Sequence, residues 1–170
     1  MPDLTDGVLG EDRETLTPST ADENRQVALA LARQARQRIL IFSRDLDRLI
    51  FDNELFYEAA SELARRSPHA HVHILVQDAQ RAVGNGHRLV DLAQRLSSKV
   101  AIHRTAEEFS HRNEAFLLVD ESGFLRRPVA DRYEASAAFH APKTVRELAK
   151  FFAEAWQHSH AAPQLRLLHI

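Results

Sequence analysis

Two patterns of apolar positions alternate along the chain. Short continuous apolar runs with β-branched residues are typical of strands buried on both faces. These runs are residues 38–43, 72–77 and 99–104. Apolar side chains recur at helical spacing in the neighbouring stretches, which are residues 24–38, 52–66 and 80–96. Alternating strands and helices predict a parallel βαβαβ core with right-handed crossovers.

The pattern changes after residue 105. Residues 115–119 and 124–126 are two further apolar runs, separated by a turn-forming Glu-Ser-Gly at 121–123, which predicts a β-hairpin added to the sheet. The last apolar stripe, at residues 145–156, has helical spacing, and Pro142 stands where the first turn of that helix would begin. The expected fold class is therefore α/β, a mostly parallel sheet with a β-hairpin and a C-terminal helix.

Charge is distributed unevenly between the N-terminal segment and the rest of the chain. Thr20 and Glu23 have the spacing of a capping box, which predicts that a helix begins there. Residues 1–22 hold six carboxylates and one arginine, which gives this segment a net charge of −5. Because the whole chain has a net charge of −2, the remainder has a net charge of +3. An acidic segment without aromatic residues or periodicity predicts a disordered tail. We expect this tail at 1–22, one domain at 23–158 and a loose C-terminal segment at 159–170.

Composition excludes several classes of protein. The 170 residues include no cysteine, which excludes a disulfide framework, a thiolate zinc site and a cysteine nucleophile. No stretch approaches the about 18 consecutive apolar residues of a membrane span, and the acidic N-terminus lacks the apolar run of a secretory signal. We therefore expect a cytoplasmic protein with no membrane partner. The mildly basic body lacks the strong positive footprint of a dedicated nucleic-acid binder, so support for a nucleic-acid partner is weak.

The first strand of the predicted hairpin lies within residues 113–120, which read Asn-Glu-Ala-Phe-Leu-Leu-Val-Asp. Together with the order of elements over residues 24–158, this stretch resembles one half of the phospholipase D-like fold. In that superfamily the strand carries the motif His-x-Lys-x-x-x-x-Asp, in which the histidine attacks a phosphodiester, the lysine binds phosphate and the aspartate supports the site. With Asp120 at the aspartate position, Asn113 takes the place of the histidine and Ala115 that of the lysine.

These two replacements predict the loss of hydrolysis. An amide cannot replace an imidazole as nucleophile or proton shuttle, and an alanine cannot neutralise a phosphate. The resemblance therefore implies a degenerate, non-catalytic relative that binds a phosphate-bearing ligand or a protein partner, with no cofactor. Because single-motif members of the superfamily pair two halves across a common cleft, the resemblance also implies a homodimer.

Three short segments resemble a group of small uncharacterised bacterial proteins. The segments read SRDLD at residues 43–47, GHRL at residues 86–89 and DRYE at residues 131–134. This second resemblance implies no particular activity.

Polar side chains follow each predicted parallel strand, at the edge where ligands of open α/β sheets bind. We expect a phosphate or a charged partner to contact these loops. A structural network, in which arginines satisfy carboxylates at the strand ends, explains the same residues equally well. The candidate ligand-binding residues are Arg44, Asp45, Asp47, Gln77, Asp78, His87, Arg88, Arg104 and Glu114.

One short motif indicates a different activity. Arg81, Gly84 and Gly86 satisfy the Arg/Gln-x-x-Gly-x-Gly/Ala pattern of GNAT acetyltransferases. In that family the loop and the following helix N-terminus bind the pyrophosphate of acetyl-CoA through backbone N–H groups. The alternative function is therefore an acetyl-CoA-dependent N-acetyltransferase.

Three histidines alternate at the start of the second predicted strand. His69, His71 and His73 would share one face of an extended strand, as a His-x-His metal site requires. They stand at the end of the strand opposite the expected ligand edge, and no matching carboxylate accompanies them. We therefore expect a solvated or helix-covered histidine stripe and no metal.

Overall fold

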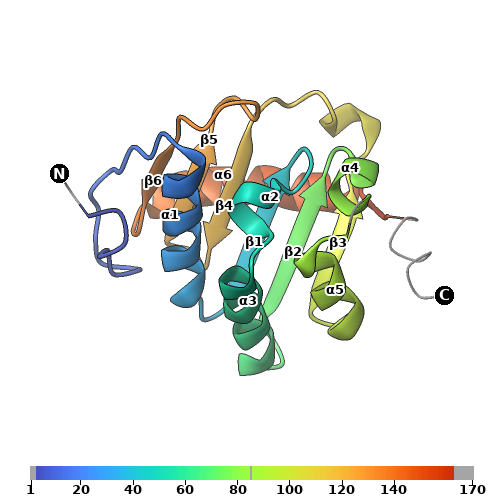
Figure 1. Cartoon of the computed structure of the whole chain (residues 1–170), viewed down its shortest axis with the longest axis horizontal. Helices are drawn as coiled ribbons and strands as arrows, with labels where there is room; N and C mark the ends of the chain where they lie inside the picture. The colour runs from blue at the N-terminus through green and yellow to red at the C-terminus, as the bar shows by residue number, and fades with distance from the viewer. Residues whose placement is uncertain (1–2, 85, 163–170) are drawn as a thin grey trace.

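The computed structural model describes residues 3–84 and 86–162, and within these ranges seven strands form one sheet in the order β6-β5-β4-β1-β2-β3-β7 (Figure 1). The strands are β1 (Arg38–Ser43), β2 (His71–Val76), β3 (Val100–Arg104), β4 (Ala115–Val119), β5 (Gly123–Arg127), β6 (Ser136–Ala138) and β7 (His160–Ala161). The helices are α1 (Ala21–Arg33), α2 (Arg48–Phe51), α3 (Glu54–Arg66), α4 (Ala79–Val83), α5 (Arg88–Arg95), the 3-10 turn η1 (Glu107–Phe109) and α6 (Pro142–Gln157).

The predicted α/β fold class is confirmed. Strands β1, β2 and β3 pair in parallel at the centre of the sheet, while β4, β5 and β6 extend one side with antiparallel pairings. Helices α1, α3 and α5 cover one face and α6 covers the other (Figure 1). The α6 face is packed by aromatic rings, since Phe42 stacks on Phe116 at 5.4 Å between ring centroids and meets Phe151 edge-on at 5.2 Å.

The single helix predicted over residues 80–96 is instead two helices, α4 and α5. Gly84 ends α4, and Gly86 has φ +76°, in the left-handed region that side chains disfavour. His87 then starts α5, because its Nδ1 accepts from the N–H of Leu89 at 3.1 Å. The apolar spacing of α4 and α5 is helical on both sides of the break, so periodicity did not reveal it.

The N-terminal segment differs from the predicted disordered tail. The N–H and C=O of Leu16 both bond to Ala137 of β6, at 2.7 and 2.9 Å, and Leu16 is 4% exposed. The N–H of Ala135 donates to Pro18, and the N–H of Gly10 donates to Phe139. Residues 10–18 therefore lie along the edge of the sheet. A single buried leucine among acidic residues has no periodicity, which is why the pattern did not indicate this contact.

At the other end of the chain, His160 and Ala161 pair with β3 as the short strand β7. The rest of the predicted loose C-terminal segment, from residue 163 onward, lies outside the described residues. Over the part of the chain that is described, no helix is both long and apolar enough to cross a membrane.

Of the alternating histidines, His73 in β2 is covered by Trp156 of α6, while His69 lies before β2 and is exposed. The rings of His73 and His103 lie flat against Trp156, at 4.2 and 4.0 Å between centroids, and His71 lies 4.3 Å from His73. Burial, and then the neighbouring His71 and His103, lower the pKa of His73 to about 4. Among the residues described here, no group of three or more histidine or acidic side chains is placed to hold a metal ion.

We expect the free energy of unfolding to fall as the pH drops from 6.5, the ordinary pKa of histidine, toward about 4. The folded pKa of His73 lies below its unfolded value, so the unfolded chain binds protons first, and stability present above pH 6.5 is lost as the pH falls. With solvent screening, His73 contributes on the order of 1–2 kcal/mol to this loss. Urea unfolding at several pH values measures it. The His73→Leu variant should flatten the dependence, and an unchanged slope would contradict the assignment.

Candidate functional site

The loop that leaves β1 is held in a strained conformation at the carboxyl edge of the parallel strands. Leu46 is fully buried and has φ 56°, which is rare for a side chain of its size. Its N–H donates to the Ser43 hydroxyl at 3.0 Å, and its C=O accepts from Nε2 of His87 at 2.9 Å. Burial lowers the pKa of His87, which keeps the ring neutral with its proton on Nε2. These contacts fix the position of the next residue, Asp47.

Asp47 is the centre of a polar network. Its Oδ1 accepts from the N–H of Leu49 at 2.9 Å, which caps α2. Its Oδ2 accepts from the Tyr133 hydroxyl at 2.9 Å and lies 3.4 Å from Nη1 of Arg127, a side chain only 5% exposed. Arg127 also donates to the C=O of Ala130 at 2.9 Å. Burial and then the bond to Asp47 raise the pKa of Tyr133 to about 12, so this hydroxyl stays a hydrogen-bond donor.

Beside Asp47 is a cavity of about 430 Å³, which we call the carboxyl-edge cavity. It is lined by Asp45, Asp47, Arg48, Leu49, Gln80, Arg81, Gly84 and Tyr133. Arg81 is 63% exposed and lies 3.4 Å from Asp45, an ion pair that solvent weakens. Arg48 is held more firmly, because its Nη1 donates to Asp52 at 3.3 Å and to the C=O of Gly86. Its Nη2 is buried and has no partner in the described residues.

Only part of the predicted ligand-binding set meets at this cavity. Asp45 and Asp47 line it, and Arg44 on the same loop pairs with Asp131 at 2.6 Å. The other predicted residues do not line the cavity and make contacts elsewhere. Gln77 donates to the C=O of Phe109 and Arg112, Asp78 caps α4, His87 caps α5, Arg88 pairs with Asp52, and Arg104 lies opposite His160 in the β3–β7 ladder.

Sequence reasoning missed Arg48, Gln80 and Tyr133 as lining residues of this cavity. Arg48 directly follows the SRDLD segment, and Tyr133 lies within the DRYE segment. Those two segments are therefore the signal that could have found them. The two segments meet because the hydroxyl of Tyr133 donates to the carboxylate of Asp47, which lies 86 positions earlier in the chain.

The start of β4 carries the residues aligned with the phosphodiesterase motif. The C=O of Asn113 accepts from the N–H of Ala130 at 2.7 Å, and Ala115 is buried at 5% exposure. Glu114, between them in sequence, is also 5% exposed and lies between two guanidinium groups. Its Oε2 accepts from Nε of Arg126 at 2.6 Å, and its Oε1 accepts from Nε of Arg112. Two cationic partners hold this carboxylate in place.

Asp120 lies at the opposite end of β4, where it organises the backbone. Its carboxylate accepts from the N–H groups of Arg36 at 3.0 Å, Gln37 at 2.8 Å and Arg38 at 3.1 Å. Asp120 itself has φ 54°, in the left-handed region that aspartate tolerates better than most residues. The aspartate aligned with the motif therefore anchors the entry into β1.

The acetyl-CoA alternative gains no support from this geometry. The backbone donors that a pyrophosphate would need are already used, since the N–H of Gly86 donates to Val83 and that of Arg88 to Asp52. The carboxylate of Asp52 stands at the start of α5, where the anion would have to bind. Arg81 lies within α4 and Gly84 is at its C-terminal end, so the acetyltransferase-like motif spans the break between α4 and α5.

The fold is that of the phospholipase D family. It is similar to Nuc from Salmonella typhimurium, a phospholipase D family member, with a TM-score of 0.62 at 12% identity over 88% of this chain and 97% of that one. It is also similar to TrmBL2, an archaeal chromatin protein that binds DNA, with a TM-score of 0.63 at 14% identity over 88% of this chain and 54% of that one. Phosphatidylserine synthase from Haemophilus influenzae Rd KW20 gives a TM-score of 0.56 at 15% identity, covering 88% and 39%.

The chain itself belongs to a domain family described as a domain of unknown function, DUF7931, whose model matches residues 20–168. No curated protein matches the chain. This chain spans about half the length of TrmBL2, of which it covers 54%. These likenesses confirm the predicted phospholipase D-like fold.

Proposed function

We propose that this chain is a non-catalytic phospholipase D-like binding module, and that a phosphate-bearing ligand occupies its carboxyl-edge cavity. The observation that carries the proposal is the guanidinium of Arg48. One of its nitrogens is buried without a partner in the described residues, while the side chain lines an open cavity. A buried unpaired donor is costly, and an anionic oxygen in the cavity would satisfy it once the guanidinium turns toward the ligand.

The absence of hydrolysis follows from the chemistry at β4. Asn113 and Ala115 provide neither a nucleophile nor a phosphate-binding cation at the two aligned positions. Glu114 is engaged by Arg112 and Arg126, so it does not replace them. Phosphate binding therefore has to rely on other residues of the same edge of the sheet.

The carboxyl-edge cavity has such residues. Arg48 is held by its ion pair with Asp52. The ion pair between Arg81 and Asp45 is exposed and contributes only about 0–1 kcal/mol to stability, so Arg81 is free to leave Asp45 and bind a ligand. The second acid of the cavity, Asp47, is already matched by the buried Arg127. The two lining arginines thus carry the charge that recognises the phosphate, and Gln80 adds a neutral donor to the lining.

Isothermal titration with inorganic pyrophosphate tests this proposal. We expect wild-type protein to bind it, and we expect Arg81→Ala to weaken binding by about tenfold through the loss of one charge-assisted contact. Arg48→Gln is the second variant, with its fold checked by thermal unfolding because Arg48 also holds the C=O of Gly86. In parallel, bis(p-nitrophenyl) phosphate should not be cleaved.

Arg25→Ala is the matched control, since it removes one arginine whose partner is Asp22, at the start of α1. It should bind pyrophosphate as the wild type does. No binding by wild-type protein, or equal losses in Arg25→Ala and Arg81→Ala, would overturn the proposed cavity. Steady cleavage of the phosphodiester would overturn the non-catalytic assignment.

A further inference from the structure

Five arginines gather at the edge of the sheet opposite the carboxyl-edge cavity. In βαβ units the helices run antiparallel to the strands, so the last turns of α1, α3 and α5 meet at the amino ends of the strands (Figure 1). We call five arginines at this edge the arginine patch: Arg33, Arg65, Arg66 and Arg95 in these last turns, and Arg36 in the loop between α1 and β1. All five side chains belong to exposed residues.

The arginines of the patch form few ion pairs. Arg95 pairs with Asp91 at 3.3 Å, on an exposed helix surface where such a pair contributes little. For the other four arginines, no carboxylate within residues 3–84 and 86–162 comes within ion-pair distance. The helix dipole favours arginine at a helix C-terminus, which explains the arginines of each last turn but not the convergence of three helix ends and Arg36 at one surface.

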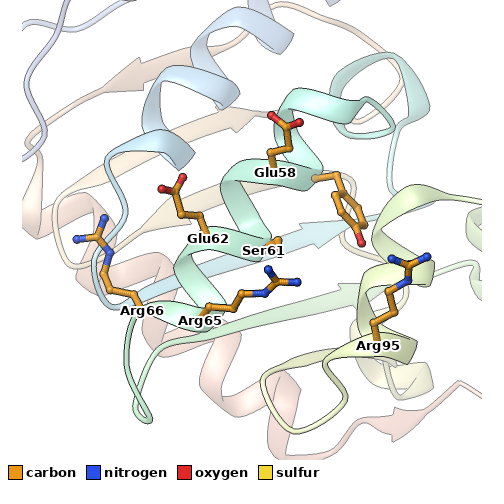
Figure 2. Close-up of a pocket in the computed structure, with 7 residues that line it drawn as sticks. Glu58, Ser61, Glu62, Arg65, Arg66 and Arg95 are labelled. Atoms are coloured by element: carbon orange, nitrogen blue, oxygen red, sulfur yellow. The ribbon is translucent and has the colours of Figure 1, made fainter.

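The surface around the arginine patch is hollowed in two places. A groove of about 710 Å³ between α3 and α5 is lined by three arginines, Arg65, Arg66 and Arg95, and by two acids, Glu58 and Glu62 (Figure 2). Tyr57 and the small buried Ser61 complete the lining. A second hollow of about 390 Å³ is lined by Arg33, Arg36 and again Arg66, together with Asp120, whose carboxylate accepts backbone N–H groups. Because Arg66 lines both, the two hollows are neighbours along one surface.

The direction of the side chains matters for what this surface binds. Figure 2 shows Arg65 directed toward Arg95 across the groove, while Glu62 and Arg66 extend to the other side of α3. Like charges that face each other repel, and an anion between them relieves that repulsion. Glu58 and Glu62 also line the groove, so the place for an anion is its arginine side, between Arg65 and Arg95.

We propose that the arginine patch binds nucleic acid through its phosphate backbone. Five guanidinium groups spread over two hollows exceed what one phosphate can neutralise, whereas a chain of regularly spaced phosphates matches them. The guanidinium fork also pairs with phosphate oxygens in a bidentate manner. Tyr57 in the same groove offers an aromatic face on which a base can stack. This site is separate from the carboxyl-edge cavity and does not rest on the function proposed there.

Fluorescence anisotropy with a labelled single-stranded DNA of about 20 nucleotides tests the proposal. The double variant Arg65→Ala/Arg66→Ala should weaken binding by about tenfold at low salt and reduce the slope of log K against log salt by about 1.4, for two lost phosphate contacts. Far-UV circular dichroism and thermal unfolding verify that the variant is folded. Arg25→Ala, which removes the same kind of charge at the start of α1, should change binding by less than about twofold.

Several results would overturn this proposal. The first is that the wild type does not bind DNA at low salt, and the second is that Arg25→Ala loses as much DNA affinity as the double variant. The third is that Arg81→Ala loses more DNA affinity than the double variant, which would place the DNA at the carboxyl-edge cavity. Poly-glutamate that competes as well as unlabelled DNA would show an acidic polypeptide site. Loss of pyrophosphate binding in Arg81→Ala with DNA binding retained would support two separate sites.

Discussion

Replacing Asp120 with alanine should lower the free energy of unfolding by about 3 kcal/mol, because several backbone donors lose their acceptor at once. The carboxylate receives the N–H groups of Arg36, Gln37 and Arg38, which enter the central strand β1. Alanine at φ 54° adds backbone strain that aspartate tolerates better. Urea unfolding monitored by circular dichroism measures the change.

Two further variants sharpen the test of Asp120. Asp120→Asn keeps an acceptor oxygen and tolerates the left-handed backbone, so we expect it to lose about half as much stability. Glu121→Ala removes the neighbouring exposed carboxylate and should change stability by less than about 0.5 kcal/mol. If Asp120→Ala were as stable as Glu121→Ala, the anchoring role would be wrong.

Replacing Arg127 with alanine should cost about 3 kcal/mol, because it leaves the mostly buried carboxylate of Asp47 without its cation. The C=O of Ala130 also loses its donor. Since Asp47 caps α2 and orders Tyr133, we expect the same variant to weaken pyrophosphate binding at the carboxyl-edge cavity. Urea unfolding and isothermal titration measure the two effects.

Arg132→Ala is the matched control for Arg127, since it removes an exposed arginine from the same loop region. Its free energy of unfolding should stay within about 0.5 kcal/mol of the wild type. Equal losses in both variants would show that the buried pair with Asp47 does not carry the effect.

Much of the architecture could be predicted from local patterns. The runs 38–43 and 72–77 are strands because their apolar residues are buried against helices on both faces. The stripe at 145–156 is helical because its spacing matches one face of α6, which packs on Phe42 and Phe116. Such patterns are readable because burial imposes them on every residue of an element.

The candidate site was less accessible to the same reasoning. Asp45 and Asp47 were found because they follow β1, but Arg48 and Tyr133 were not expected as its partners. The bond between Asp47 and Tyr133 joins positions 86 residues apart, and no local pattern specifies such a contact. The arginine patch likewise draws on three helices that are separate in the sequence.

The amino-acid sequence by itself determined the alternation of strands and helices, the β-hairpin and the loss of the two aligned phosphodiesterase groups at Asn113 and Ala115. Those features depend on residue type and on spacing within one element. Only the tertiary structure decided that Asp120 anchors β1, that Leu16 covers the sheet edge and that Arg48 has an unpaired nitrogen beside a cavity. The physical reason is that hydrogen-bond satisfaction and charge compensation depend on which distant groups the fold brings together.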